Sequence, residues 1–260
     1  MHRRNVSLTV CAMVVAGAAG SAHATISYTT SGGTISENFD SLLAAGTGNA
    51  WANDSTITGW SLFNKTPAAI ATYNSSPGSS NAGAFYSFGV AGVNPDAERA
   101  LGGVASGGAY FGSPASGTVA GWIAVAITNN TASTLTSFTV GYDGEQWRNG
   151  GNTNAQTMVL EYGFGASFGA VGSWTAAGAA FDFTSPIVGS VAAALDGNDA
   201  ANRVAGLGGT VSSLTWNAGD TLWVRWIENN DIGNDHGLAV DNFSFSAVPT
   251  PGSAALLGLG

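Results

Sequence analysis

TLWVRWIENNDIGNDHGLAVDNFSFS, residues 221–246, contains two runs of apolar and aromatic residues separated by a polar loop. The first run, LWVRWI, carries bulky side chains at both odd and even positions. Such a pattern is typical of a strand that is packed on one face and partly covered on the other. The loop that follows is acidic and rich in Asn and Gly. The stretch therefore predicts two strands joined by an acidic loop.

The second run places a carboxylate among apolar side chains. Strict two-residue alternation puts Asp241 on the same face as Phe243 and Phe245, which must point into a core. An unpaired buried charge costs on the order of several kcal/mol, so the carboxylate needs a partner. We therefore predict a buried ion pair between Asp241 and Arg225 or Arg148.

The same alternation recurs in short runs along most of the chain, and it is clearest in residues 119–128, 137–147 and 157–164. Turn-forming residues separate these runs, and no segment shows a convincing amphipathic helical pattern. Residues 25–246 are therefore expected to form one all-β domain, a jelly-roll-like or concanavalin-like β-sandwich of about ten or more short antiparallel strands. No internal repeat is visible, which argues against a solenoid or a propeller.

The N-terminus has the pattern of a secretory signal peptide. Two arginines are followed by an apolar run and then by SAHA, a small-x-small cleavage pattern ending at Ala24. The single cysteine, Cys11, lies inside the apolar run. We therefore expect residues 1–24 to be removed, and the mature chain to be exported to the cell surface or beyond without any cysteine.

The mature chain is strongly acidic. Beyond residue 24 it has five basic residues against sixteen acidic ones, a formal net charge of −11. Such a surface repels phosphate backbones and anionic lipids, so nucleic acids and membrane surfaces are not expected partners.

The C-terminal segment resembles the PEP-CTERM sorting signal of bacterial exported proteins. Val248-Pro249-Thr250-Pro251 precedes a small Leu-rich run, GSAALLGLG, in the variant of the motif with Thr in place of Glu. The resemblance implies that residues 247–260 are a proline linker and the start of a sorting segment that a membrane-bound processing enzyme reads. Only nine residues follow Pro251 and no arginine cluster is present, so we expect a truncated or degenerate form of the signal.

The body of the chain also resembles the β-rich domain of such exported proteins. The segments EQWR at 145–148, WVRW at 223–226 and DHGLAVDNF at 235–243 carry this resemblance. It implies an extracytoplasmic jelly-roll-like fold and no particular activity.

The sequence contains few of the residue patterns that known catalytic sites require. The mature chain has one histidine, His236, and no GxSxG motif, so a Ser-His-Asp site or a zinc site lacks its components. Asp143 and Glu145 share a strand face with Trp147, which suggests a polysaccharide hydrolase or lyase. Two acids on one strand, however, do not straddle a substrate. We expect a non-enzymatic protein, with the polysaccharide-active enzyme as the alternative.

The loop NNDIGND at 229–235 offers hard oxygen ligands, so calcium is a possible cofactor, with Asp231 and Asp235 as its ligands. The alternative is an Asx-rich hairpin loop that caps its own backbone. A purely structural, calcium-stabilised surface protein is a further possible function.

Eight tryptophans make carbohydrate binding the leading hypothesis for function, because aromatic faces stack on sugars while amides and carboxylates bind their hydroxyls. Trp51, Trp147 and Trp223 are the tryptophans expected to allow exposure. The sequence thus predicts a carbohydrate-binding or adhesive protein whose partner is an extracellular polysaccharide, with seven candidate ligand-binding residues: Trp147, Trp223, Asn230, Asp231, Asn234, Asp235 and His236.

Overall fold

The two strands of the 221–246 stretch lie in different sheets. In the computed structural model, which describes residues 25–90 and 98–250, β16 (Thr221–Asn230) belongs to a six-stranded sheet and β17 (Gly237–Val248) to a nine-stranded one. The loop between them crosses from one sheet to the other. The expected hairpin loop is therefore wrong, because six residues are enough to link two packed layers as well as two paired strands.

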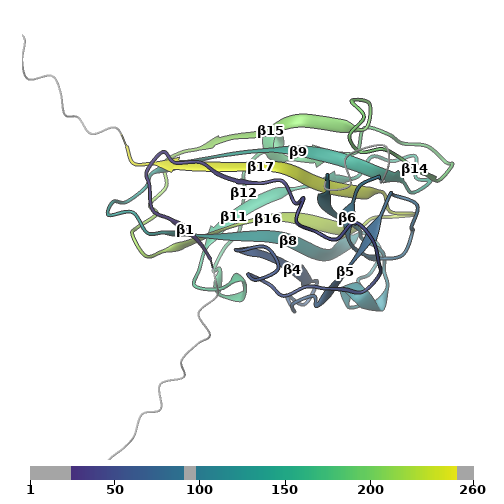
Figure 1. Cartoon of the computed structure of the whole chain (residues 1–260), viewed down its shortest axis with the longest axis horizontal. Helices are drawn as coiled ribbons and strands as arrows, with labels where there is room; N and C mark the ends of the chain where they lie inside the picture. The colour runs from purple at the N-terminus through teal and green to yellow at the C-terminus, as the bar shows by residue number, and fades with distance from the viewer. Residues whose placement is uncertain (1–24, 91–97, 251–260) are drawn as a thin grey trace, which may run out of the picture.

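The two sheets form the layers of a sandwich, visible edge-on in Figure 1. Strand β8 is central in the six-stranded sheet, which contains β1 (Ile26–Tyr28), β4 (Trp60–Asn64), β8 (Thr118–Asn129), β11 (Leu160–Phe164), β12 (Thr175–Ala176) and β16. Strand β17 is central in the nine-stranded sheet, which also contains β2 (Ile35–Glu37), β3 (Asn49–Ala50), β5 (Thr72–Ser76), β6 (Ala84–Phe88), β7 (Ala100–Val104), β9 (Ser137–Asn149), β14 (Ala193–Ala194) and β15 (Arg203–Val211). A separate pair is formed by β10 (Thr157–Met158) and β13 (Phe183–Thr184).

The all-β class and the sandwich are confirmed. The only helices among the described residues are three single 3₁₀ turns, η1 (Ala109–Phe111), η2 (Phe168–Ala170) and η3 (Ala179–Phe181). Most strands pair in the antiparallel sense, and two pairs are parallel, β1 with β8 and β5 with β6. None of the helices in residues 25–90 and 98–250 has the length and apolar character needed to cross a membrane.

Aromatic side chains fill the space between the sheets. Trp226 of β16 stacks on Trp60 with ring centroids 5.8 Å apart, and it meets Tyr142 of β9 at 5.3 Å and Phe243 of β17 at 5.9 Å, both edge-on. These contacts join the six-stranded sheet to the nine-stranded sheet through one buried cluster.

A β-bulge at Asn242 decides where Asp241 points. The β17–β9 register advances three residues on β17, from Asp241 to Ser244, against two on β9. Asn242 takes up the extra residue with a φ of 49°, a left-handed conformation that asparagine tolerates. The extra residue reverses the alternation, so that Phe243 points into the core while Asp241 lies on the opposite face.

The last strand extends two residues past Ser246, where the predicted β-domain ends. Strand β17 continues through Val248, and buried Ala247 exchanges hydrogen bonds of 2.8 and 2.9 Å with the Tyr28 hydroxyl. The predicted signal peptide at 1–24 and the sorting segment beyond Thr250 lie outside the described residues.

Candidate functional site

A polar cleft of about 280 Å³ opens where the loop after β16 meets the ends of β7 and β9. Its lining is mostly polar and contains no aromatic side chain: Asn81, Val104, Ser106, Gly107, Arg148, Gly150, Ala192, Asn230, Gly233, Asn234 and Asp235. Three of the predicted ligand-binding residues, Asn230, Asn234 and Asp235, are therefore brought together at one place.

The loop that lines the cleft is held by hydrogen bonds within itself and to neighbouring segments. The Asp235 carboxylate accepts the backbone N–H of Asp231 at 2.8 Å, and the Asn230 amide donates to the Pro114 carbonyl at 3.0 Å. The Asn234 carbonyl accepts from the Gln156 side chain at 2.8 Å. Burial raises the pKa of Asp235 to about 7. These contacts hold the loop in shape and leave the exposed Asn234 side chain at the cleft.

His236 has a structural role. It is 2% exposed, its Nδ1 accepts the N–H of Gly150 at 2.9 Å, and its Nε2 lies 3.3 Å from the carbonyl of Asn154. Burial lowers the pKa of His236, which favours the neutral ring with the proton on Nε2. The prediction that His236 contacts a ligand is wrong, because both ring nitrogens face the protein backbone.

The tryptophans do not form an exposed sugar platform. Trp147 and Trp223 are fully buried and Trp51 is 4% exposed, so their predicted exposure is wrong. Trp147 stacks on Phe88, and the Trp223 indole N–H donates to the Gly165 carbonyl. Both residues lie on the outer faces of their sheets, but neighbouring segments cover those faces. Of the eight tryptophans only Trp174 is partly exposed.

The predicted ion pair of Asp241 is also wrong. Arg225 binds Glu161 at 2.5 Å and stacks on the Trp174 ring at 3.8 Å. Arg148 donates to the carbonyls of Gly78 and Ser79. Arg225 belongs to the six-stranded sheet, and the bulge at Asn242 turns Asp241 away from that sheet. Asp241 is nonetheless buried, at 3% exposure.

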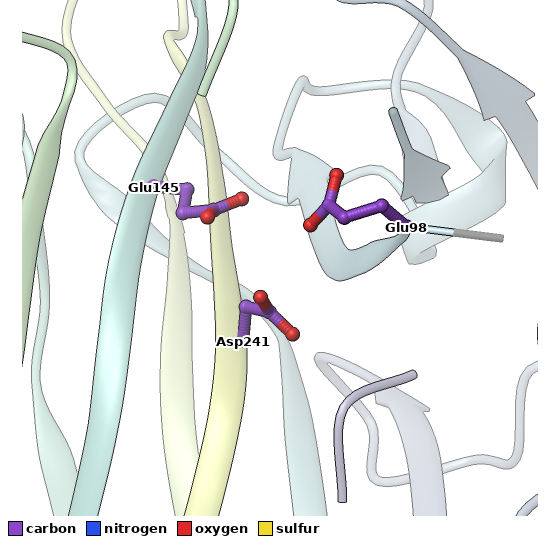
Figure 2. Close-up of side chains that lie close together, drawn as sticks. All are labelled: Glu98, Glu145 and Asp241. Atoms are coloured by element: carbon purple, nitrogen blue, oxygen red, sulfur yellow. The ribbon is translucent and has the colours of Figure 1, made fainter. Parts of the chain in front are cut away.

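Asp241 lies instead in a cluster of three carboxylates, drawn in Figure 2. Glu145 comes from β9, Asp241 from the neighbouring β17, and Glu98 from the segment just before β7, which flanks β17 on its other side. One oxygen of each lies within 4.8 Å of the others. Among the described residues, this is the only group of three or more such side chains that converge closely enough to hold a metal ion.

The cluster perturbs the protonation of its members. Burial, followed by the charge of Asp241, raises the pKa of Glu145 to about 8. Burial raises the pKa of Asp241 to about 7, with contributions from Glu98 and Asp40. The pKa of Glu98 is raised as well, mainly by burial and against its hydrogen bond from Asn198.

Calcium binding at Asp231 and Asp235 stays a prediction. Burial raises the pKa of Asp231, and these two carboxylates do not converge with a third acidic group among the described residues. Glu228 is buried nearby with one oxygen unpaired, and burial raises its pKa well above the ordinary value.

Sequence reasoning missed Glu98 and Glu228 and assigned Glu145 to a possible catalytic pair. The structure places Glu145 with no exposed surface and its Oε2 accepts the Trp147 indole N–H at 2.9 Å. Asp143, the other member of that pair, lies 3.9 Å from Arg203. The one local signal is that Glu145 shares a strand face with Trp147, which indicates burial of Glu145 but not its acidic neighbours.

Comparison with known proteins assigns no family. No protein-family model matches the chain, and no curated protein sequence matches it. Two solved structures are similar over most of this chain. An arabinose-bound α-L-arabinofuranosidase has a TM-score of 0.37 and 11% identity, covering 89% of this chain and 31% of its own. An isomalto-dextranase of Arthrobacter globiformis complexed with panose has a TM-score of 0.30 and 10% identity, covering 86% of this chain and 33% of its own. Both are carbohydrate-active enzymes, this chain spans about a third of the length of each, and similarity at this level does not assign a function.

Proposed function

We propose that this protein is an exported, non-enzymatic β-sandwich of the cell surface or extracellular matrix that binds polysaccharide through its polar cleft. The observation that carries the proposal is the convergence of three asparagines, Asn81, Asn230 and Asn234, with Arg148 and Asp235 around one cavity. Amides, a guanidinium and a carboxylate supply the donors and acceptors that bind sugar hydroxyls.

The shape of the cleft limits the ligand. A volume of about 280 Å³ is at the small end of small-molecule sites. Because no aromatic ring lines it, binding depends on hydrogen bonds rather than on stacking along a chain. We therefore expect recognition of a single terminal or branching sugar unit.

The charge of the protein limits the class of polysaccharide. A net charge of −9 for the whole chain, and −11 beyond residue 24, repels polyanionic chains. Neutral glycans are the expected ligands.

The cleft favours binding over cleavage. Glycosidases of the usual kind place two carboxyl groups on either side of the bond that is cleaved. Asp235 is the only acidic residue lining this cleft, and its Oδ1 is bonded to the loop backbone. A hydrolase or lyase would need a second acid that the lining does not supply.

The test is binding of the purified full-length protein to an array of neutral and anionic glycans, followed by titration of the best neutral ligand. The double substitution Asn81→Ala and Asn234→Ala is expected to weaken binding about tenfold or more, since two lost hydrogen bonds of about 1 kcal/mol each exceed the 1.4 kcal/mol of a tenfold change. Asn217→Ala, in the turn before β16 at the other end of that strand, is the matched control and should bind normally.

Two results would contradict the proposal. One is the absence of binding to every glycan on the array. The other is loss of binding in Trp174→Ala with normal binding in the cleft variant, which would move the site to the outer face of the six-stranded sheet.

A further inference from the structure

The cluster brings together three acidic side chains, two of them buried, without a basic side chain in direct contact among the described residues. Among the described residues, no lysine or arginine forms a salt bridge with Glu98, Glu145 or Asp241. Arg99, next to Glu98 in the chain, directs its Nε and Nη2 to Ser87. A buried group of like charges is costly unless a cation or protons compensate it.

Two oxygens in this cluster have no hydrogen-bond partner within the part of the chain that the structure describes. Glu145 Oε1 and Asp241 Oδ1 are both inaccessible to solvent and unpaired, although their residues are 0% and 3% exposed. Figure 2 shows the carboxyl groups of Glu145 and Asp241 pointing toward the same space as that of Glu98. Unpaired buried oxygens on side chains that converge on one space are suited to bind a cation.

Two of the carboxylates are oriented by hydrogen bonds from neighbouring side chains. The Trp147 indole N–H donates to Glu145 Oε2 at 2.9 Å, and the Asn198 amide donates to Glu98 Oε2 at 2.6 Å. Each bond orients one oxygen of a carboxylate and leaves the other available. Hydrogen bonds of this kind typically orient the ligands of metal sites.

The three carboxylate oxygens indicate which cation the cluster can bind. All three ligands are carboxylate oxygens, which suit hard cations and not zinc or copper. Calcium accepts irregular sets of oxygen ligands, whereas magnesium demands near-ideal octahedral geometry and keeps several of its waters. Three oxygens within 4.8 Å of one another, on side chains of unequal length and burial, therefore suit calcium better than magnesium.

We propose that Glu98, Glu145 and Asp241 bind one calcium ion on the outer face of the nine-stranded sheet. The ion ties the segment that leads into β7 to the central strands β9 and β17, and backbone carbonyls or water complete its coordination. The site is independent of the polar cleft, and it is distinct from the loop carboxylates Asp231 and Asp235.

The test is calorimetric titration of the chelator-treated full-length protein with calcium chloride. We expect one ion per chain, and a weakening of at least 100-fold in Glu145→Gln and in Asp241→Asn. Both variants keep the size of the side chain, and their near-UV circular dichroism without calcium reports whether they fold. Asp231→Asn is the matched control, in which one ion should bind with unchanged affinity.

A second measurement does not depend on the variants. Terbium in place of calcium should luminesce on excitation of tryptophan in the unmodified protein, because Trp147 is bonded to Glu145, and calcium should displace it. The proposal is overturned if the unmodified protein binds no calcium, or if binding survives in both cluster variants. Loss of binding in Asp231→Asn alone would instead assign the ion to the loop.

Discussion

Without calcium, the free energy of unfolding is expected to fall by several kcal/mol as the pH rises from about 5 to about 9. The folded-state pKa values of Glu145, about 8, and Asp241, about 7, are raised above the ordinary values of 4.5 and 3.8. Between those values the folded protein binds more protons than the unfolded chain, so stability is lost as the pH rises. Each pH unit in this range costs up to about 1.4 kcal/mol per group.

Burial sets the sign of this effect, and the charged groups around the cluster modify its size. Glu98 and Asp40 face Asp241, as does Asp143, and all three add negative charge. Arg203 acts on Glu145 and Arg99 on Glu98 in the opposite sense, but burial is the largest cause for both glutamates. Protonation therefore relieves the cluster when no metal ion is bound.

Urea unfolding in a chelating buffer at several pH values measures this prediction. In the double variant Glu145→Gln and Asp241→Asn, the free energy of unfolding should depend less on pH. Asp235 contributes to this pH dependence with the same sign in both proteins, so its contribution cancels when the two curves are subtracted. Saturating calcium should also flatten the curve of the unmodified protein. Equal slopes in the variant and the unmodified protein would show that the cluster does not control stability.

Replacement of Trp226 by alanine is expected to lower the free energy of unfolding by about 3–5 kcal/mol. Trp226 is fully buried and contacts Trp60 within its own sheet and Tyr142 and Phe243 across the sandwich. The truncation leaves a cavity between the layers that such rigid neighbours cannot fill. Equilibrium denaturation at constant pH and calcium concentration gives the value.

Two control variants test whether the loss of stability in Trp226→Ala is specific to this buried ring. Trp226→Phe retains an aromatic ring and should cost clearly less. Trp174→Ala removes a partly exposed ring on the outer face of the six-stranded sheet, where it stacks on Arg225, and should also cost less. A loss below about 1 kcal/mol in Trp226→Ala would mean that this cluster does not hold the layers together.

The strands that could be predicted are those whose side chains alternate without interruption. Strands β8, β9 and β16 lie almost where the pattern places them. Strand β15 was not predicted, because three of its residues, Gly206, Gly208 and Gly209, have no side chain to alternate. Its pairing with β9 supplies the order that its own sequence does not indicate.

The candidate site was harder to predict. It depends on which face of the strand each side chain occupies and on contacts between residues that are far apart in the sequence. Burial of Asp241 was predicted correctly, but one extra residue at Asn242 reversed its face and removed Arg225 as a partner. Arg148 lies opposite Gly237 and donates to the Gly78 and Ser79 carbonyls. Glu98 and Glu145 meet Asp241 only because β7, β17 and β9 are neighbours in the sheet. No local pattern encodes that order.

The most direct test of the account is a crystal structure of the full-length protein grown with calcium. We predict a single strong density peak between Glu98, Glu145 and Asp241, with one oxygen of each at about 2.3–2.6 Å from the ion. A crystal in which these three carboxylates enclose only water, or in which calcium occupies the 229–235 loop instead, would contradict it.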